Sequence, residues 1–332
     1  MSVSAGSYKY GLGGQSNDVN REDLIDVYTL QTPWDTPWLA QAPKTEAQSV
    51  LHQWLVDTLR SPVTTGAIEG AAYTYVTSTT PTRVTNVSMI FRKDIGVTRT
   101  QMKANPAAIG NTYTHEIDKA TKELATDIET SVFANLTSAT GATGTARVMK
   151  GFQNFITSNT AYPASLGAAA TAGQLTVNDF NSMLQTIYTA GGNPDQVFVS
   201  PAVKRQVSAF TLVQQNRNIA AAEKKLIQGI DMFDSDFGLL AIVLDRHVPQ
   251  STNTTTAASG AATDVRGTMF ILERAKNRWA WFDPVHHDYV GKLGDSVNGI
   301  VVGEGCLEVL NEKANGMIKS INNKNAALLG DS

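Results

Sequence analysis

The feature that most constrains this chain is a long β excursion followed at once by one long amphipathic helix. Residues 49–59 (SVLHQWLVDTL) are predicted to form an outgoing strand and residues 83–101 (RVTNVSMIFRKDIGVTRTQ) its return, around a glycine-rich tip. Apolar side chains follow one face of the return at a spacing of two, namely Val87, Met89, Phe91, Ile95 and Val97. An isolated two-stranded ribbon is at best marginally stable in water, so this one must lie on another surface. A neighbouring copy of the chain is the economical choice, which favours assembly over catalysis.

The helix that follows is predicted to span residues 111–135, with Asn111 or Thr112 as its cap. Its apolar residues recur every three or four positions and form one stripe: Tyr113, Ile117, Ala120, Leu124, Ile128 and Val132. At 1.5 Å per residue the helix is roughly 37 Å long. That length is typical of a structural spine.

Composition excludes some classes of function. Of the 332 residues, 42% are hydrophobic and only 17% are charged, against about a quarter in an average protein. A weakly charged surface rich in Thr, Ser and Ala suits large interfaces between identical subunits. The formal net charge of −3 leaves no strong basic field, so we expect at most weak, non-specific contact with DNA phosphates.

Neither secretion nor membrane insertion is expected. Residues 1–18 lack the basic and apolar regions of a signal peptide, and no apolar run reaches membrane-spanning length. Cys306 is the only cysteine, so no disulfide can form within one chain, and a buried hydrophobic role is expected for it. These features indicate a cytosolic product without a membrane partner.

The N-terminal region is predicted to be an extended arm. Residues 21–30 (REDLIDVYTL) have the pattern of a short amphipathic helix, and three prolines in residues 31–45 exclude regular structure there. Trp34 and Trp38 lie in this proline-rich segment. They are interpreted either as anchors that dock the arm on another surface or as local core residues, with equal weight.

The rest of the chain predicts an α+β architecture whose strands come from distant segments. A capping box at Thr176 opens a helix, residues 196–200 form a buried strand, and Pro201 begins the next helix. Further strands are predicted at 238–244, 268–272 and 279–282, with a surface loop at 249–267. Residues 306–310 and 316–321 are predicted to pair as a hairpin.

Few residues suggest chemistry, and no cofactor or metal is expected. His286 and His287 would point to opposite faces of a strand, which disfavours a shared metal. Asp231, Asp234 and Asp236 lack the calcium-loop pattern. We therefore expect a non-enzymatic protein.

Two alternatives remain open. The string Gly294-Asp295-Ser296 is similar to the nucleophile block of one hydrolase class, so a soluble serine hydrolase could use Ser296 with His286 or His287. A surface adhesin built from Thr-rich β structure is the other alternative. The missing signal peptide and the long central helix argue against the adhesin.

The order of elements resembles the major capsid proteins of tailed bacteriophages, which have the Hong Kong 97-like fold. Seven segments carry the resemblance in colinear order: REDLIDVYTL with DTPWLAQ, LHQWLVDTL, IFRKDIGVTRTQ, THEIDKATKELATDIE, RVMKGFQNFI, GGNPDQVFVSPAVKRQVSAF, and GDSV followed by LEVLNEKANGMI. The resemblance implies a structural protein whose copies form an icosahedral head shell around double-stranded DNA.

The resemblance also implies a division of the chain. Residues 1–45 would be the N-terminal arm and residues 46–103 the E-loop, which lies over an adjacent subunit. Residues 104–175 would be the P-domain, whose spine helix is 111–135. Residues 176–295 would be the A-domain, and residues 296–332 would return to the P-domain. Six residues are expected at contacts between copies: Trp34, Trp38, Trp54, Gly66, Gly70 and Phe91.

The implied partners are other copies of the chain, in pentamers and hexamers, together with a portal and a possible decoration protein. Some members begin with a long scaffolding segment, whereas this chain starts almost directly with the arm, so a separate scaffolding protein is expected. No lysine occurs between Lys44 and Lys93, so an isopeptide cross-link from the loop tip is not expected. The implied location is the virion shell, after assembly in the host bacterial cytoplasm.

Overall fold

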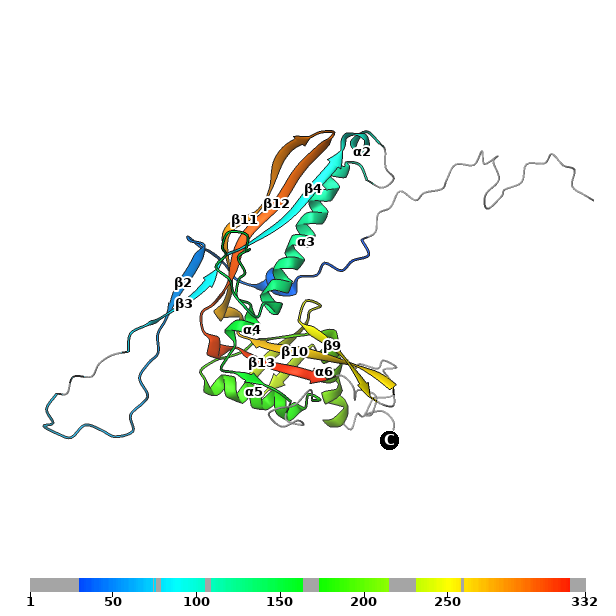
Figure 1. The fold of residues 1–332 in the computed structure, drawn as a ribbon. Helices are drawn as coiled ribbons and strands as arrows, with labels where there is room; N and C mark the ends of the chain where they lie inside the picture. The colour runs from blue at the N-terminus through cyan, green and yellow to red at the C-terminus, as the bar shows by residue number, and fades with distance from the viewer. Residues whose placement is uncertain are drawn as a thin grey trace, which may run out of the picture.

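The molecule consists of a tall part, a broad part and a long projecting loop (Figure 1). The computed structural model describes residues 30–73, 75, 79–104, 109–163, 173–214, 231–257 and 260–322. In the tall part, helix α3 (Thr112–Ala134) lies along a four-stranded sheet; the broad part is built on a seven-stranded sheet. The helix expected at residues 21–30 lies, apart from its last residue, outside the described residues.

Helix α3 confirms the predicted spine. The Asn111 side chain accepts hydrogen bonds from the backbone N–H groups of Tyr113 and Thr114, which caps the first turn. The predicted apolar stripe faces the protein interior, with Ala120, Leu124, Ile128 and Val132 buried. Its partners are strands β4 (Met89–Thr98) and β12 (Ser296–Val309).

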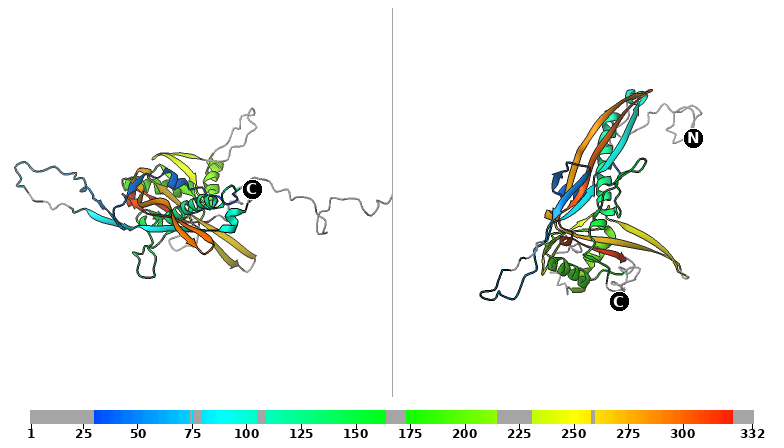
Figure 2. Two further views of the ribbon diagram at one scale, coloured as in Figure 1. Left: turned by 90° about the horizontal axis from the view of Figure 1, so that it is seen from above. Right: turned by 60° about the vertical axis from the view of Figure 1, so that its left-hand side comes forward.

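The four-stranded sheet has the order β1-β11-β12-β4, with β1 at Lys44–Glu46 and β11 at Asn277–Leu293. Strands β11 and β12 form a long antiparallel hairpin that rises beside α3 (Figures 1 and 2). The sequence predicted only a short strand at 279–282. The glycines of β12 hide its pattern, yet packing requires them: a Cβ at Gly305 would lie 2.8 Å from the ring of Trp279.

The predicted ribbon divides into two pairings. Strand β2 (Leu51–Val56) pairs only with β3 (Thr82–Val87), whereas β4 leaves the ribbon after the buried Ser88 and pairs with β12. The expected single return strand at 83–101 is therefore wrong beyond residue 87. The physical reason is that β12 offers β4 a backbone edge along its whole length. After β4 comes the short helix α2 (Arg99–Lys103).

The base of the ribbon is tied to the tall part by buried polar groups. The Asn86 side-chain amide donates to the carbonyl oxygens of Leu307 (2.7 Å) and Lys150 (3.3 Å), and its oxygen accepts from the Lys150 N–H (2.8 Å). The indole N–H of Trp54 donates to the carbonyl of Val309 at 2.9 Å. The ribbon base is thus a fixed part of the subunit.

Replacing Asn86 with leucine is expected to lower the free energy of unfolding by about 2–4 kcal/mol, because buried backbone groups lose their partner at about 1–3 kcal/mol each. Gln53→Leu, at an exposed site on β2, is the matched control and should change stability by less than about 0.5 kcal/mol. Urea unfolding of both variants checks this. Equal midpoints for the two would show that Asn86 does not anchor the ribbon.

The seven-stranded sheet runs β5-β13-β10-β6-β8-β7, with β9 pairing β10. Its strands are β5 (Thr160–Ala161), β6 (Gln196–Val199), β7 (Met232–Ser235), β8 (Gly238–Leu244), β9 (Gln250–Ala257), β10 (Gly260–Leu272) and β13 (Gly316–Asn322). Helices α5 (Val177–Thr189) and α6 (Pro201–Gln214) belong to this part. The predicted Thr176 capping box is present, with Asp179 as its second member.

Two expectations for this part are wrong. A loop is expected at residues 249–267, but residues 250–257 form β9 and pair with residues 260–267 of β10, because a threonine-rich segment favours a strand. Residues 306–310 and 316–321 do not pair with each other. The first belongs to β12, whereas β13 pairs with β10 and β5, and the 3-10 turn η2 (Glu312–Ala314) carries the chain between the two sheets.

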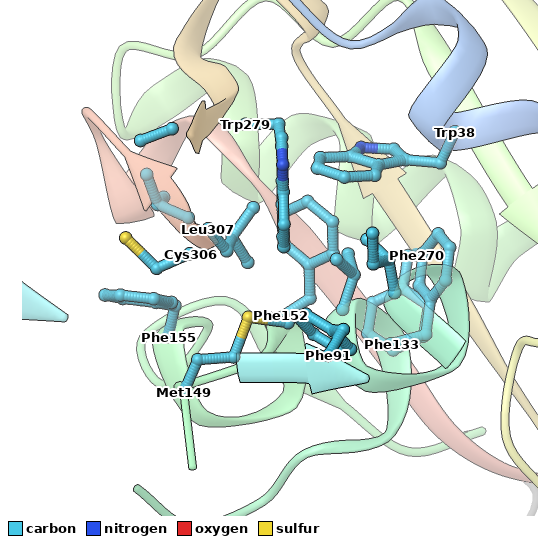
Figure 3. Packing of buried hydrophobic residues seen from close by; sticks show 14 of the residues in the cluster. Trp38, Phe91, Phe133, Met149, Phe152, Phe155, Phe270, Trp279, Cys306 and Leu307 are labelled. Atoms are coloured by element: carbon cyan, nitrogen blue, oxygen red, sulfur yellow. The ribbon is translucent and has the colours of Figure 1, made fainter. Parts of the chain in front are cut away.

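One aromatic core joins the two sheets (Figure 3). Phe133 of α3 lies 5.2 Å from Phe270 of β10 and 5.5 Å from Phe198 of β6, measured between ring centroids. Phe152 of α4 (Phe152–Phe155) and Trp38 of α1 (Pro37–Gln41) complete the cluster around Phe133. Trp279 continues it into the four-stranded sheet. The N-terminal segment thus contributes to the core of the subunit.

Candidate assembly surfaces

The projecting loop between β2 and β3 carries large apolar side chains that the described residues do not cover. Exposure reaches 99% for Leu59, 80% for Val63, 82% for Ile68 and 84% for Tyr73. The loop extends away from both sheets in all three views (Figures 1 and 2). Several large apolar side chains exposed on one projecting loop favour an interaction site, so the loop has the surface expected of a contact with another molecule.

The loop backbone is open at the glycines that the sequence singled out. Gly66 and Gly70 lie in the loop, and no atom would come within 4 Å of a Cβ added at either. Gly70 has φ +76°, a conformation that glycine adopts without the penalty of a side chain. Their contact with a neighbouring copy stays a prediction.

Three of the six residues expected at contacts lie in the core of their own chain. Trp38, Trp54 and Phe91 are at most 9% exposed. For Trp38 this favours the alternative of local core packing, because its ring lies against Phe133, Phe152 and Trp279. Burial within the subunit argues against direct contact for these three, and their contact with another copy stays a prediction.

Trp34 differs from them, since it is 51% exposed and the Lys122 ammonium lies 4.9 Å from its ring centroid. It remains available to a second molecule.

Sequence reasoning placed Leu59 at the end of the outgoing strand, whereas β2 ends at Val56, and it did not single out the other apolar residues of the loop. Leu59, Val63 and Ile68 are spaced irregularly among Thr, Ser, Pro and Gly, so no helix or strand of this segment could gather them on one face. Large apolar side chains in a segment unable to bury them were the available signal.

A groove lies where the ribbon meets the body. Its volume is about 540 Å³. It is lined mainly by apolar groups, including Leu55, Val84, Phe155 and Leu310. Leu55 is 67% exposed, so the apolar surface of the loop continues into this groove.

A second exposed apolar surface lies at the far end of the β11–β12 hairpin. Tyr289, Val290 and Leu293 are 59%, 65% and 79% exposed. The ion pair between Arg99 of α2 and Asp295 of the turn, at 2.9 Å, helps to hold this tip. The two apolar surfaces lie at opposite ends of the subunit (Figure 1), which suits contacts with different neighbours.

The structure does not bring together the residues that the hydrolase alternative requires. Ser296 donates to the carbonyl of Leu293 at 2.9 Å, whereas His287 bonds the Tyr113 hydroxyl at 2.9 Å. His287 is paired with Val301 in the sheet, five residues along β12 from Ser296, or roughly 16 Å at 3.3 Å per residue. His286 instead contacts Asp288 and the Pro284 carbonyl. A nucleophile and its base must lie within hydrogen-bond reach, and these do not.

The described residues show neither a metal cluster nor a membrane-spanning helix. Among the described residues, no three His, Cys, Asp or Glu side chains gather in a way that could hold a metal ion. In the same part of the chain, no helix combines the length and apolar character needed to cross a membrane. Cys306 is buried, and burial raises the pKa of its thiol to about 12, in keeping with the expected packing role.

Comparison with solved structures identifies the fold. The cyanophage A-1(L) capsid asymmetric unit superposes with a TM-score of 0.61 at 13% identity, covering 92% of this chain and 98% of that one. The capsid of Myoviridae phage XM1 gives 0.58 at 10% identity, with 90% and 97% covered. The SrpI encapsulin of Synechococcus elongatus PCC 7942 gives 0.56 at 10% identity, with 92% and 93% covered. The fold is Hong Kong 97-like.

The sequence supplies the family. No curated protein sequence matches the chain significantly. The family of SU10 major capsid proteins matches it over residues 11–322, nearly its whole length. The chain therefore belongs to the SU10 major capsid protein family, and it is a structural protein of a viral capsid shell.

Proposed function

We propose that many copies of this chain close into an icosahedral head shell, as pentamers and hexamers, around packaged double-stranded DNA. The observation that carries the proposal is the projecting loop, whose apolar side chains are exposed and find no cover in the described part of the chain. Family membership and fold agree with this role. Assembly takes place in the host cytoplasm with a separate scaffolding protein, a portal and, in some shells, a decoration protein.

In this proposal the loop acts as the E-loop and lies over an adjacent subunit. A rigid ribbon base, held by Asn86 and Trp54, sets the direction of the loop. Burial of three or four apolar side chains at each of many equivalent contacts stabilises the shell even where each contact alone is weak.

The proposed division of the chain follows the two sheets. Residues 1–45 are the N-terminal arm and 46–103 the E-loop, with β4 joined to the P-domain sheet. Strand β11, expected in the A-domain, pairs with β12 and β4, so residues 277–309 are assigned to the P-domain. Strand β13 pairs with β10 and is assigned to the A-domain.

Two negative features complete the proposal. The chain has no catalytic role, since its sole hydrolase signature is not brought together. The wall also binds packaged DNA only weakly, because a net charge of −3 gives little attraction for phosphate.

Electron microscopy of the purified chain, alone and with a co-expressed scaffolding protein, tests the function. Closed shells, or rings of five and six subunits, are expected. A strict monomer or dimer under both conditions would overturn the proposal. Hydrogen exchange gives a second test, because residues 57–73 should gain protection in the particle relative to the free subunit.

A further inference from the structure

Three distant segments meet at one buried carboxyl group, that of Glu129. Glu129 lies on α3 and is fully buried (0% exposed). Its two oxygens accept the backbone N–H groups of Trp38 at 2.7 Å and Leu39 at 2.9 Å. The same side chain also contacts Asp245, directly after β8. The arm root, defined here as residues 30–42, is thereby joined to the spine helix and to the broad part.

Asp245 supplies a second buried carboxyl group, which is 1% exposed. One oxygen, Oδ1, accepts the backbone N–H of His247 at 2.8 Å. The other, Oδ2, is buried and finds no N–H or O–H donor among the described residues. The Glu129 and Asp245 carboxyl groups interact with each other in this buried site. Two carboxylates offer only acceptors, so a hydrogen bond between them forms only when one of them is protonated.

The surroundings favour protonation of this carboxyl pair. Burial, and then the nearby charge of Asp245, raise the pKa of Glu129 to about 8, against the lowering effect of the two backbone N–H groups. Burial also raises the pKa of Asp245, while the N–H and the charge of His247 act in the opposite direction. A carboxyl group whose pKa is raised in the closed latch holds a proton there. It releases that proton when the latch opens and the group becomes solvated.

The other charged groups near the arm root have their own partners. Arg246 faces Asp35 at 3.9 Å, the His247 ring bonds the Thr130 hydroxyl at 3.0 Å, and Lys122 lies over Trp34. None of these contacts is with Glu129. The charge of His247 acts on Asp245, so within the described residues it is the Glu129 carboxyl group whose neutralisation depends on the proton.

We propose that Glu129 and Asp245 form a proton-dependent latch that holds the arm root against the spine helix, and that loss of their shared proton loosens it. The latch belongs to the single subunit and does not depend on shell formation. The position of the latch is important because residues 1–29 directly precede the arm root, which sets where the arm leaves the body. Loosening the root changes the reach of the arm toward other copies.

The direction of the pH dependence follows from the pKa values. Glu129 has an ordinary pKa of 4.5 when solvated and about 8 in the closed latch. The contribution of the proton is therefore complete below about pH 4.5, declines as the pH rises, and is lost above about pH 8. Within this window the equilibrium constant for opening should rise by up to about tenfold per pH unit.

Hydrogen exchange of the full-length free subunit between pH 5 and pH 8, corrected for intrinsic exchange, tests the latch. We expect a peptide covering residues 30–41 to lose protection by about a hundredfold or more, while residues 177–199 keep theirs. Protection of 30–41 that does not change with pH would overturn the latch. A parallel loss in 177–199 would also overturn it, because the opening would then be global.

Asp245→Asn isolates the pair. The amide introduced at position 245 can donate to an ionised Glu129, which removes the repulsion between the two carboxylates. The loss of protection of residues 30–41 between pH 5 and pH 8 should then be less than about threefold. Asp127→Asn is the matched control on the same helix, at a partly exposed carboxylate paired with Lys93, and should keep the wild-type slope. A wild-type slope in Asp245→Asn would overturn the proposal. If that variant does not fold, Glu129→Gln takes its place, with the same flattening expected.

Discussion

Replacement of Leu59, Val63 and Ile68 together with serine is expected to abolish shell formation while the subunit stays folded. All three side chains are at least 80% exposed in the subunit, so their loss removes no internal contact. The free energy of unfolding should change by less than about 0.5 kcal/mol. In a shell, burial of each would contribute about 1.5–3 kcal/mol, or about 4.5 kcal/mol for three at the lower end. That sum is roughly a thousandfold in the association constant.

Sedimentation and electron microscopy at fixed protein concentration measure this loss. The matched control is Thr64→Ser with Thr65→Ser, which changes the same loop while removing little apolar surface, and it should assemble normally. Shells formed by the Leu59/Val63/Ile68 variant at wild-type concentrations would show that the loop does not carry the contact. Loss of folding in that variant would show instead that the loop packs on its own subunit.

The second large effect is expected inside the subunit. Phe133→Ala should lower the free energy of unfolding by about 3–5 kcal/mol, the range for a fully buried phenylalanine, from a total of about 5–15 kcal/mol for a typical domain. Phe133 is 0% exposed and lies within 5.6 Å of the rings of Phe152, Phe198 and Phe270. Its removal leaves a cavity between α3 and the seven-stranded sheet, at the junction of the two parts (Figure 3).

Phe282→Ala is the control for this effect, since Phe282 is 38% exposed; its loss should cost less than about 1 kcal/mol. Urea unfolding followed by tryptophan fluorescence measures both, because Trp38 lies 6.5 Å from Phe133. Similar midpoints for the two variants would mean that the junction is not held by this core. A changed slope for Phe133→Ala alone would indicate that the two parts unfold separately.

Local signals predicted the spine helix, the Thr176 capping box and the strand at 196–199. Each depends on residues only a few positions apart, as in the bonds from Asn111 to the next turn. The same holds for the ribbon base, where the strand expected at 49–59 is observed as β2 and the start of the return expected at 83–101 as β3. The family resemblance also followed from the order of such segments.

Pairing between distant segments could not be predicted in this way. Strand β4 could satisfy its backbone with β2 or with β12, and periodicity is the same in both cases; the long edge of β12 decided it. The β11–β12 hairpin was not predicted, because the glycines of β12 break the apolar alternation. Aromatic rings lie so close to some of these glycines that a larger residue would not fit. The burial of Trp38, Trp54 and Phe91 within the subunit was missed for a related reason, since the sequence pattern of large apolar side chains is the same in a core and at an interface.

Spacings within a few residues were enough to predict the spine helix and α5 with their caps and the segment of the projecting loop, whereas the class of protein followed from the colinear order of segments along the chain. The helix α1 (Pro37–Gln41) was not predicted, since the three prolines in residues 31–45 predicted irregular structure there. Only the tertiary structure decided which strands share a sheet, which aromatic rings join the two parts, and that Glu129 meets Asp245 beneath the arm root. Such contacts depend on which distant surfaces bury one another with all backbone groups paired. Local periodicity does not indicate which distant surfaces these are.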